Sequence, residues 1–156
     1  MGPRRVFLLA AACAAVFVPA ASGRTDQIGR SIELRWPANG TLTSPFGWDA
    51  GREHAGLDIG ILRSLDVTAA EEGVVTRVGT VTGYEGYGTI VEVQLNERYS
   101  TLYAHLARAF VEPGDYVTPT QKLGLAGCTG WCTGTHLHFE LRDRGRPVNP
   151  ALLLAR

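Results

Sequence analysis

The chain has 156 residues, of which 45% are hydrophobic and 19% are charged, as is usual for a globular protein. This length suffices for one domain with a substantial core and is too short for two. Basic and acidic residues balance at 15 each, and without residues 1–22 they number 13 and 15. A slightly acidic chain gives no electrostatic reason to expect nucleic-acid binding.

The first 22 residues have the pattern of a secretory signal peptide. "MGPRR" is positively charged, residues 6–18 form an apolar run, and "PAASG" offers small residues for cleavage. The run is short for a membrane span, which needs about 20 apolar residues. We therefore predict a signal peptide over 1–22, no stable membrane insertion after cleavage, and a secreted or extracytoplasmic (cell envelope) location. An uncleaved anchor remains an alternative. A lipoprotein acylated at Cys13 is weaker, because no large aliphatic residue precedes that cysteine closely.

Beyond a polar lead-in over 23–40, the chain alternates short stretches typical of strands with glycine-rich turns. The expected strands fall within residues 41–48, 73–81, 88–95, 100–106, 114–117, 121–127 and 135–143. Residues 102–110 are the best helical candidate, although their first half also fits a strand. "GYEGYG" (83–88) lacks the context of a nucleotide-binding loop and is interpreted as a turn. Strands spaced about 8–15 residues apart predict a mainly β domain.

Two cysteines bound a five-residue loop, "CTGWC". In an exported protein, Cys128 and Cys132 can form a disulfide, which the chain-entropy model values at roughly 2 kcal/mol. The pair could stiffen the rim of a groove, with Trp131 as an exposed contact surface. Two alternatives are free thiols and a crowded zinc site that adds His136 and His138.

Two of the four histidines lie one residue apart in "THLHFEL" (135–141). Alternate residues of a strand face the same side, so His136, His138 and Glu140 share one face. The intervening residues are apolar and fit a core. A lone H-x-H is weak evidence, since it also occurs in strands without metal.

The other two histidines lie in "HAGLD" (54–58) and "YAHL" (103–106). His54 and Asp58 are four residues apart and can share a face. Taken singly, His54 fits a surface loop and His105 a satisfied core histidine. Together the histidines suggest a zinc site, because two His and one Asp can bind Zn²⁺ and leave a net charge of +1. Such a site can lower the pKa of bound water to about 7, and the remaining histidines could transfer protons.

Three segments in this order, "HAGLD", "STLYAHL" and "TGTHLHFEL", resemble the signature segments of the lysostaphin-like (LytM-type) zinc metalloendopeptidases that act on peptidoglycan. "LTSPFGW", "EPGDYV" and "RPVNPALLL" resemble smaller parts of the same pattern. The resemblance covers residues 41–153. It implies a metallopeptidase catalytic domain, folded as a small antiparallel β-sheet domain of the duplicated-hybrid-motif type, with the site in a groove across the sheet.

The same resemblance implies the site residues. His54, Asp58 and His138 match the metal ligands, and His105 and His136 match the catalytic non-ligand histidines. One Zn²⁺ per chain is implied. The implied function is an exported zinc metalloendopeptidase that hydrolyses peptide bonds in peptidoglycan stems or cross-bridges by a zinc-activated water. We expect a peptidoglycan peptide as substrate and a monomer.

The sequence departs from the family pattern at two positions and leaves other functions open. Thr120 stands where the family usually has Gly before Gln121, and Thr135 stands where it usually has Pro before H-x-H. Asp26 or Asn39 of the lead-in could occupy a fourth zinc position. The chain could instead be a non-catalytic LytM-type regulator that binds or activates other cell-wall hydrolases, although such relatives usually lack a ligand. A cupin-like or copper-binding barrel is disfavoured because no histidine follows His138.

Overall fold

The computed structural model of the protein describes residues 32–49 and 51–155, so the predicted signal peptide lies outside the described residues. None of the helices in these ranges is both long and apolar enough to cross a membrane. The strands are β1 Thr41–Ser44, β2 Gly47–Asp49, β3 Arg52–His54, β4 Leu57–Gly60, β5 Asp66–Thr68, β6 Gly73–Gly79, β7 Ile90–Gln94, β8 Tyr99–Ala104, β9 Leu106–Ala109, β10 Tyr116–Val117, β11 Lys122–Ala126, β12 Leu137–Asp143 and β13 Arg146–Val148. Two short 3₁₀ helices are η1 Glu85–Tyr87 and η2 Pro150–Leu152.

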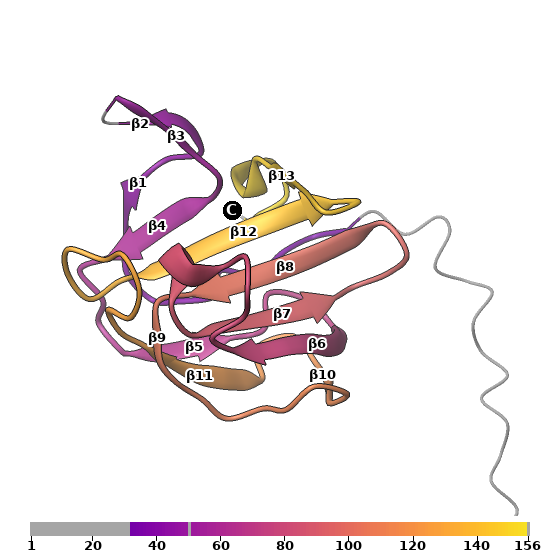
Figure 1. Ribbon diagram of the computed structural model, residues 1–156. Coiled ribbons are helices and arrows are strands. Elements are labelled where there is room, and N and C mark those ends of the chain that lie inside the picture. Colours follow the sequence, from indigo (N-terminus) through magenta and orange to yellow (C-terminus); the bar gives the residue numbers. More distant parts are fainter. Residues whose placement is uncertain (1–31, 50, 156) are drawn as a thin grey trace, which may run out of the picture. The chain divides into compact units, whose positions relative to one another are not determined.

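The main sheet runs in the order β1-β4-β12-β8-β7-β6-β10, with β13 paired to β12 (Figure 1). A smaller sheet has the order β5-β11-β9, and β2 and β3 form a hairpin that projects at the upper left of Figure 1. Neighbouring strands in all three sheets are antiparallel. The predicted mainly antiparallel β fold is confirmed.

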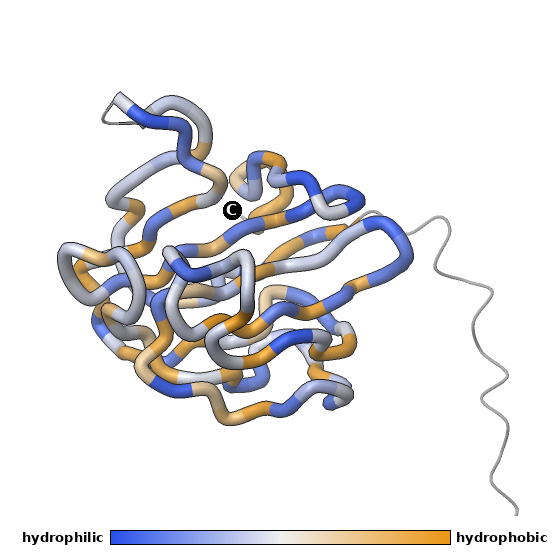
Figure 2. Tube along the Cα trace, in the orientation of Figure 1, coloured by the Kyte–Doolittle hydropathy of each residue, from blue (hydrophilic) through white to orange (hydrophobic). Residues whose placement is uncertain are grey.

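The core lies behind β12. Leu137, Phe139 and Leu141 are at most 1% exposed, as the alternation of "THLHFEL" predicts. Figure 2 shows the same alternation of polar and apolar residues along several strands of the main sheet. Leu34, from the region expected as a polar lead-in, is fully buried in this core and forms a parallel bridge with Leu154. Its burial ties residues 32–40 to the domain.

The stretch 102–110, the best helical candidate, instead forms strands β8 and β9. They are separated by His105, whose φ of +60° lies in the left-handed region. A residue other than glycine rarely adopts this conformation, and it costs about 1–2 kcal/mol. Two backbone hydrogen bonds hold the break: His105 N–H donates to the Tyr87 carbonyl at 2.9 Å, and Leu106 N–H donates to the Thr89 carbonyl at 3.0 Å. Strain of this kind is concentrated at functional sites.

Candidate metal centre and catalytic site

Asp58 on β4 lies directly opposite His138 on β12 in the antiparallel register. Their side chains meet, with Asp58 Oδ1 2.8 Å from His138 Nδ1. Gly56 permits this approach, because a Cβ there would clash with the Phe139 carbonyl oxygen and lie 2.9 Å from His138 Nε2. The glycine of "HAGLD" is therefore required by the packing of β4 against β12.

His54 ends β3 and is oriented by the turn that precedes the β2–β3 hairpin. Its Nδ1 lies 2.7 Å from the Pro45 carbonyl oxygen and 3.1 Å from Ser44 Oγ. A carbonyl can only accept, so Nδ1–H donates to Pro45. The lone pair of neutral His54 is then on Nε2, which faces Asp58 and His138.

Three atoms that can bind a metal lie close together: His54 Nε2, Asp58 Oδ1 and His138 Nδ1. They are separated by 3.2 Å between His54 and Asp58, 3.1 Å between His54 and His138, and 2.8 Å between His138 and Asp58. Ligands about 2.1 Å from a tetrahedral zinc ion lie about 3.4 Å apart, so small shifts admit the ion. Two imidazoles and one carboxylate are a donor set that zinc prefers, and among the described residues these three form a group that can hold a metal.

The other two histidines lie beside this cluster. The rings of His105 and His136 are 4.7 Å apart between centroids. His105 Nδ1 lies 2.8 Å from the Thr129 carbonyl oxygen, and His136 Nδ1 lies 2.7 Å from the Gly134 carbonyl oxygen. Both Nδ1 atoms therefore donate, which leaves each Nε2 available. His136 Nε2 is 3.7 Å from Asp58 Oδ1. The structure thus brings together all five residues that the sequence proposed for the site.

Residues 52–150 match the model of peptidase family M23. The chain belongs to this family. The match includes the proposed metal ligands and both non-ligand histidines, and the resemblance stated from the sequence is confirmed.

Curated relatives of this M23 protein carry different functional names. It is 38% identical over 121 residues to the "Lipoprotein NlpD/LppB homolog" of Pseudomonas aeruginosa, covering 78% of this chain and 39% of the relative. It is 37% identical to the "DD-carboxypeptidase/endopeptidase Mpg" of Neisseria meningitidis, covering 70% and 26%. It is 34% identical to the "Murein hydrolase activator NlpD" of Escherichia coli, covering 74% and 30%. The chain thus spans less than half the length of these relatives.

Solved structures share the fold. A zinc-containing peptidase from Vibrio cholerae matches with a TM-score of 0.67 and 33% identity, covering 77% of this chain and 39% of that one. The catalytic domain of the antimicrobial peptidase lysostaphin from Staphylococcus simulans matches with a TM-score of 0.61 and 27% identity, covering 72% and 88%. The neighbours thus include peptidases of the same architecture.

Burial and hydrogen bonds shift the pKa values of four side chains in the M23 site. Burial opposes ionisation of Asp58, but hydrogen bonds from His138 and His54 hold its pKa well below the usual range. The hydrogen bond to Asp58 raises the pKa of His54. Burial disfavours the charged form of His138, yet Asp58 and Glu140 together raise its pKa. Burial lowers the pKa of His105, which favours a neutral ring that can accept a proton.

These shifts predict opposite pH trends for the metal-free and zinc-loaded protein. The raised pKa of His54 stabilises the metal-free fold fully below about pH 6.5, and this contribution is lost as the pH rises through the folded-state pKa. Zinc binds only the unprotonated ring, so its stabilisation grows over the same range. The difference in melting temperature between zinc-loaded and chelator-treated protein should therefore widen from about pH 6 to pH 8. A difference in melting temperature that narrows as the pH rises would contradict the assignment of His54 as a metal ligand.

Sequence reasoning missed the residues behind His138. Glu140 is fully buried, and its Oε1 lies 3.0 Å from His138 Nε2. Tyr87 hydroxyl donates to the same oxygen at 2.7 Å, and Arg142 Nε donates to Oε2 at 2.7 Å. Arg142 also donates to the Tyr84 hydroxyl. The sequence signal was the shared face of His138 and Glu140, but it gave Glu140 no role.

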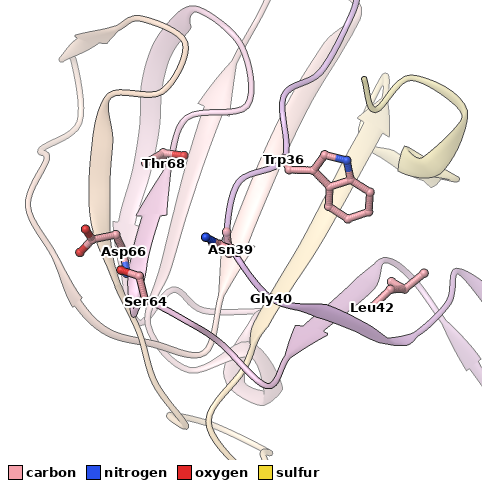
Figure 3. Close-up of a pocket in the computed structure, with 8 residues that line it drawn as sticks. Trp36, Asn39, Gly40, Leu42, Ser64, Asp66 and Thr68 are labelled. Atoms are coloured by element: carbon pink, nitrogen blue, oxygen red, sulfur yellow. The ribbon is translucent and has the colours of Figure 1, made fainter. Parts of the chain in front are cut away.

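A separate hollow of about 610 Å³ lies against the region that precedes β1. Its lining includes Trp36, Asn39, Leu42 and Asp66 (Figure 3). None of the three candidate metal ligands lines it. The lead-in candidate Asn39 therefore faces a different hollow, and Asp26 lies outside the described residues.

A disulfide joins Cys128 to Cys132, so the predicted pairing is confirmed and these sulfurs are not available as thiolate ligands. The loop supplies the Thr129 carbonyl that holds His105. The Trp131 side chain is 86% exposed, while the backbone N–H of Trp131 donates to the Gly86 carbonyl at 2.9 Å. The loop thus supports the site from one side and presents an exposed indole beside it.

Replacing Cys128 and Cys132 together by serine should lower the free energy of unfolding by roughly 2 kcal/mol, the chain-entropy value for so short a loop. Denaturant unfolding of both proteins measures this change. Thiol labelling of the native wild-type protein should find neither Cys128 nor Cys132 reactive. If both react, the disulfide is not present in the mature protein.

Proposed function

We propose that the chain is an exported zinc metalloendopeptidase that hydrolyses peptide bonds in peptidoglycan stems or cross-bridges. The observation that carries the proposal is the complete set of five groups. His54, Asp58 and His138 converge as metal ligands, and His105 and His136 adjoin them with Nε2 atoms not used by their carbonyl partners. A peptidase of this type needs both halves of the site.

A bound zinc ion supplies Lewis acidity, which polarises the scissile carbonyl and lowers the pKa of water to about 7. The protein side chains do the rest. His136 Nε2, close to Asp58, is placed to accept the proton released on attack and pass it to the leaving amine. The neutral His105 ring has its lone pair on Nε2, so this atom can accept a proton, and the protonated ring can then donate to the charge that develops on the carbonyl oxygen. The Thr129 and Gly134 carbonyls fix the orientation of these two rings.

The assignment to peptidoglycan rests on the relatives. One carries the name DD-carboxypeptidase/endopeptidase, another is named a murein hydrolase activator, and a third is named a lipoprotein. These names fit a substrate in the cell wall and an extracytoplasmic location. We further propose that Trp131, exposed on its disulfide-bonded loop, contacts the substrate at the edge of the site.

The second candidate is a regulator that activates other wall hydrolases, and the 34% identity to the activator NlpD favours it. The retention of all three ligands favours an enzyme instead, because an activator has no use for a water-activating metal. The two functions differ in a simple respect: an activator clears a wall substrate only when its partner hydrolase is present.

Zymography on purified sacculi tests the proposal. The zinc-loaded protein alone should clear the substrate, and a chelator should prevent clearing that added zinc restores. Clearing that appears only when a second wall hydrolase is added would support the regulator instead.

A further inference from the structure

A buried network of charged and aromatic side chains contacts the proposed ligand His138 on its own face of β12. Glu140 is fully buried on β12, two residues after His138 and on the same face. Arg142, the next residue on that face, is also buried. Burying a carboxylate and a guanidinium costs free energy unless both are paired and hydrogen-bonded. This cost calls for a reason to keep the pair.

Every buried polar atom in this network has a hydrogen-bond partner. Glu140 Oε1 accepts from Tyr87 at 2.7 Å and lies 3.0 Å from His138 Nε2, while Oε2 accepts from Arg142 Nε. The Arg142 guanidinium carbon lies 5.0 Å from the centre of the Tyr84 ring. Among the described residues no buried side-chain nitrogen or oxygen lacks a hydrogen-bond partner. Glu140 is therefore held from two sides, and its carboxylate cannot turn away from His138.

The orientation of His138 follows from this contact. An imidazole has two ring nitrogens, and a proton on one leaves the lone pair of the neutral ring on the other. A carboxylate that accepts from Nε2–H assigns the metal-facing lone pair to Nδ1. Nδ1 is the atom that faces Asp58 at 2.8 Å and His54 at 3.1 Å.

The geometry points to Glu140 as a positioning residue for the metal centre: clamped by Arg142 and Tyr87, it fixes the ring of His138 with Nδ1 directed at the metal position. This inference rests on the proposed function, because it presumes that zinc binds there. Carboxylate partners of metal-ligating histidines fix the tautomer and raise the basicity of the ligand.

The segment "GYEGYG" (83–88), whose sequence predicts only a turn, supports this network. This segment contains η1 Glu85–Tyr87, and both of its tyrosines join the network. Tyr87 also accepts the backbone N–H of His105 through its carbonyl. The same short helix therefore supports the ligand His138 and the left-handed turn at His105.

Two double variants test whether the oxygen of residue 140 that accepts from His138 determines zinc binding. Glu140→Met with Arg142→Met removes the buried charge pair and the acceptor together. Glu140→Gln with Arg142→Met removes the same charges but keeps an oxygen that can accept from His138 and Tyr87. Methionine and glutamine have similar volumes, and replacing a buried ion pair with apolar groups is often tolerated. Glu92 keeps Arg77 and Ser100 as partners in both variants.

Zinc affinity, measured by competition with a chromophoric chelator, is the main readout. The methionine variant should bind zinc about 10–100-fold more weakly than the wild type, whereas the glutamine variant should stay within a few-fold of it. In NMR spectra of the zinc-loaded proteins, the Nε2–H proton of His138 should be protected from exchange in the wild type and glutamine variant and lost in the methionine variant. Thermal unfolding without zinc establishes that each variant folds.

Equal zinc affinities for two folded double variants would overturn the inference, because a purely structural role affects both alike. If the methionine variant does not fold, the glutamine variant compared with wild type decides: an affinity reduced tenfold or more overturns the role of the acceptor oxygen. Failure of the proposed function looks different, since the wild-type protein would then bind no zinc or leave sacculi intact.

Discussion

Replacing His54 by alanine is expected to abolish both stoichiometric zinc binding and hydrolysis of wall peptides. His54 Nε2 is one of three donor atoms that lie within 3.2 Å of one another, and only two would remain. A metal that supplies about 4 kcal/mol or more of transition-state stabilisation corresponds to a loss of at least about a thousandfold in rate. Metal analysis after gel filtration and the rate of dye release from labelled sacculi measure the two effects.

Glu53→Ala is the matched control for His54→Ala, because Glu53 is exposed on the same strand, β3, and next to His54. This variant should keep one zinc per chain and the wild-type rate. If His54→Ala is folded and retains full activity, the proposed metal centre is wrong.

Replacing His105 or His136 by alanine should separate catalysis from metal binding. Neither side chain belongs to the group that can hold the metal, so both variants should keep one zinc per chain. Proton transfer by a positioned side chain contributes about 10²–10⁴-fold to a rate. We expect kcat to fall in that range for His136→Ala, with a smaller change in KM.

His105→Ala carries an additional structural change. His105 has a φ of +60°, and alanine cannot make the hydrogen bond from Nδ1 to the Thr129 carbonyl. Its effect should therefore be compared with that of His105→Asn, since asparagine tolerates the left-handed region better. Both should lose activity while retaining zinc. Loss of zinc in His136→Ala would show that His136 is a ligand instead.

The sequence was a good guide to β12, the strand that carries the proposed ligand His138 and its neighbour Glu140. In β12 the period of two explains both faces, because alternate side chains point to opposite sides of the sheet. Leu137 and Phe139 are buried as predicted, and His138 and Glu140 lie together on the opposite face. The partner of Glu140 could not be predicted, because Tyr87 is 53 residues away in sequence.

His54 and Asp58 lie together for a different reason from the one that their spacing suggests. Their spacing of four predicts a shared face within one segment. In the structure His54 ends β3, in a hairpin, whereas Asp58 belongs to β4 in the main sheet. Gly56 lies between these strands, where a Cβ would clash with β12, and such a long-range contact leaves no local periodicity to detect.

The break at His105 also escaped prediction. "LYAHLARAF" has no glycine or proline to mark the end of a strand, and residues other than glycine seldom adopt a positive φ. The break is imposed by backbone hydrogen bonds to Tyr87 and Thr89, which lie in a different part of the chain. The resemblance to known signature segments, not the local pattern, identified His105 as a site residue.

The most direct test of the central claim is mass analysis of fragments released from peptidoglycans of defined cross-link chemistry by the purified, zinc-loaded protein alone. We predict fragments in which one peptide bond has gained a water molecule, released in the presence of zinc and absent with chelator or with His54→Ala. Intact cross-links after incubation with a folded protein that holds one zinc per chain would contradict the assignment of this M23 protein as an endopeptidase.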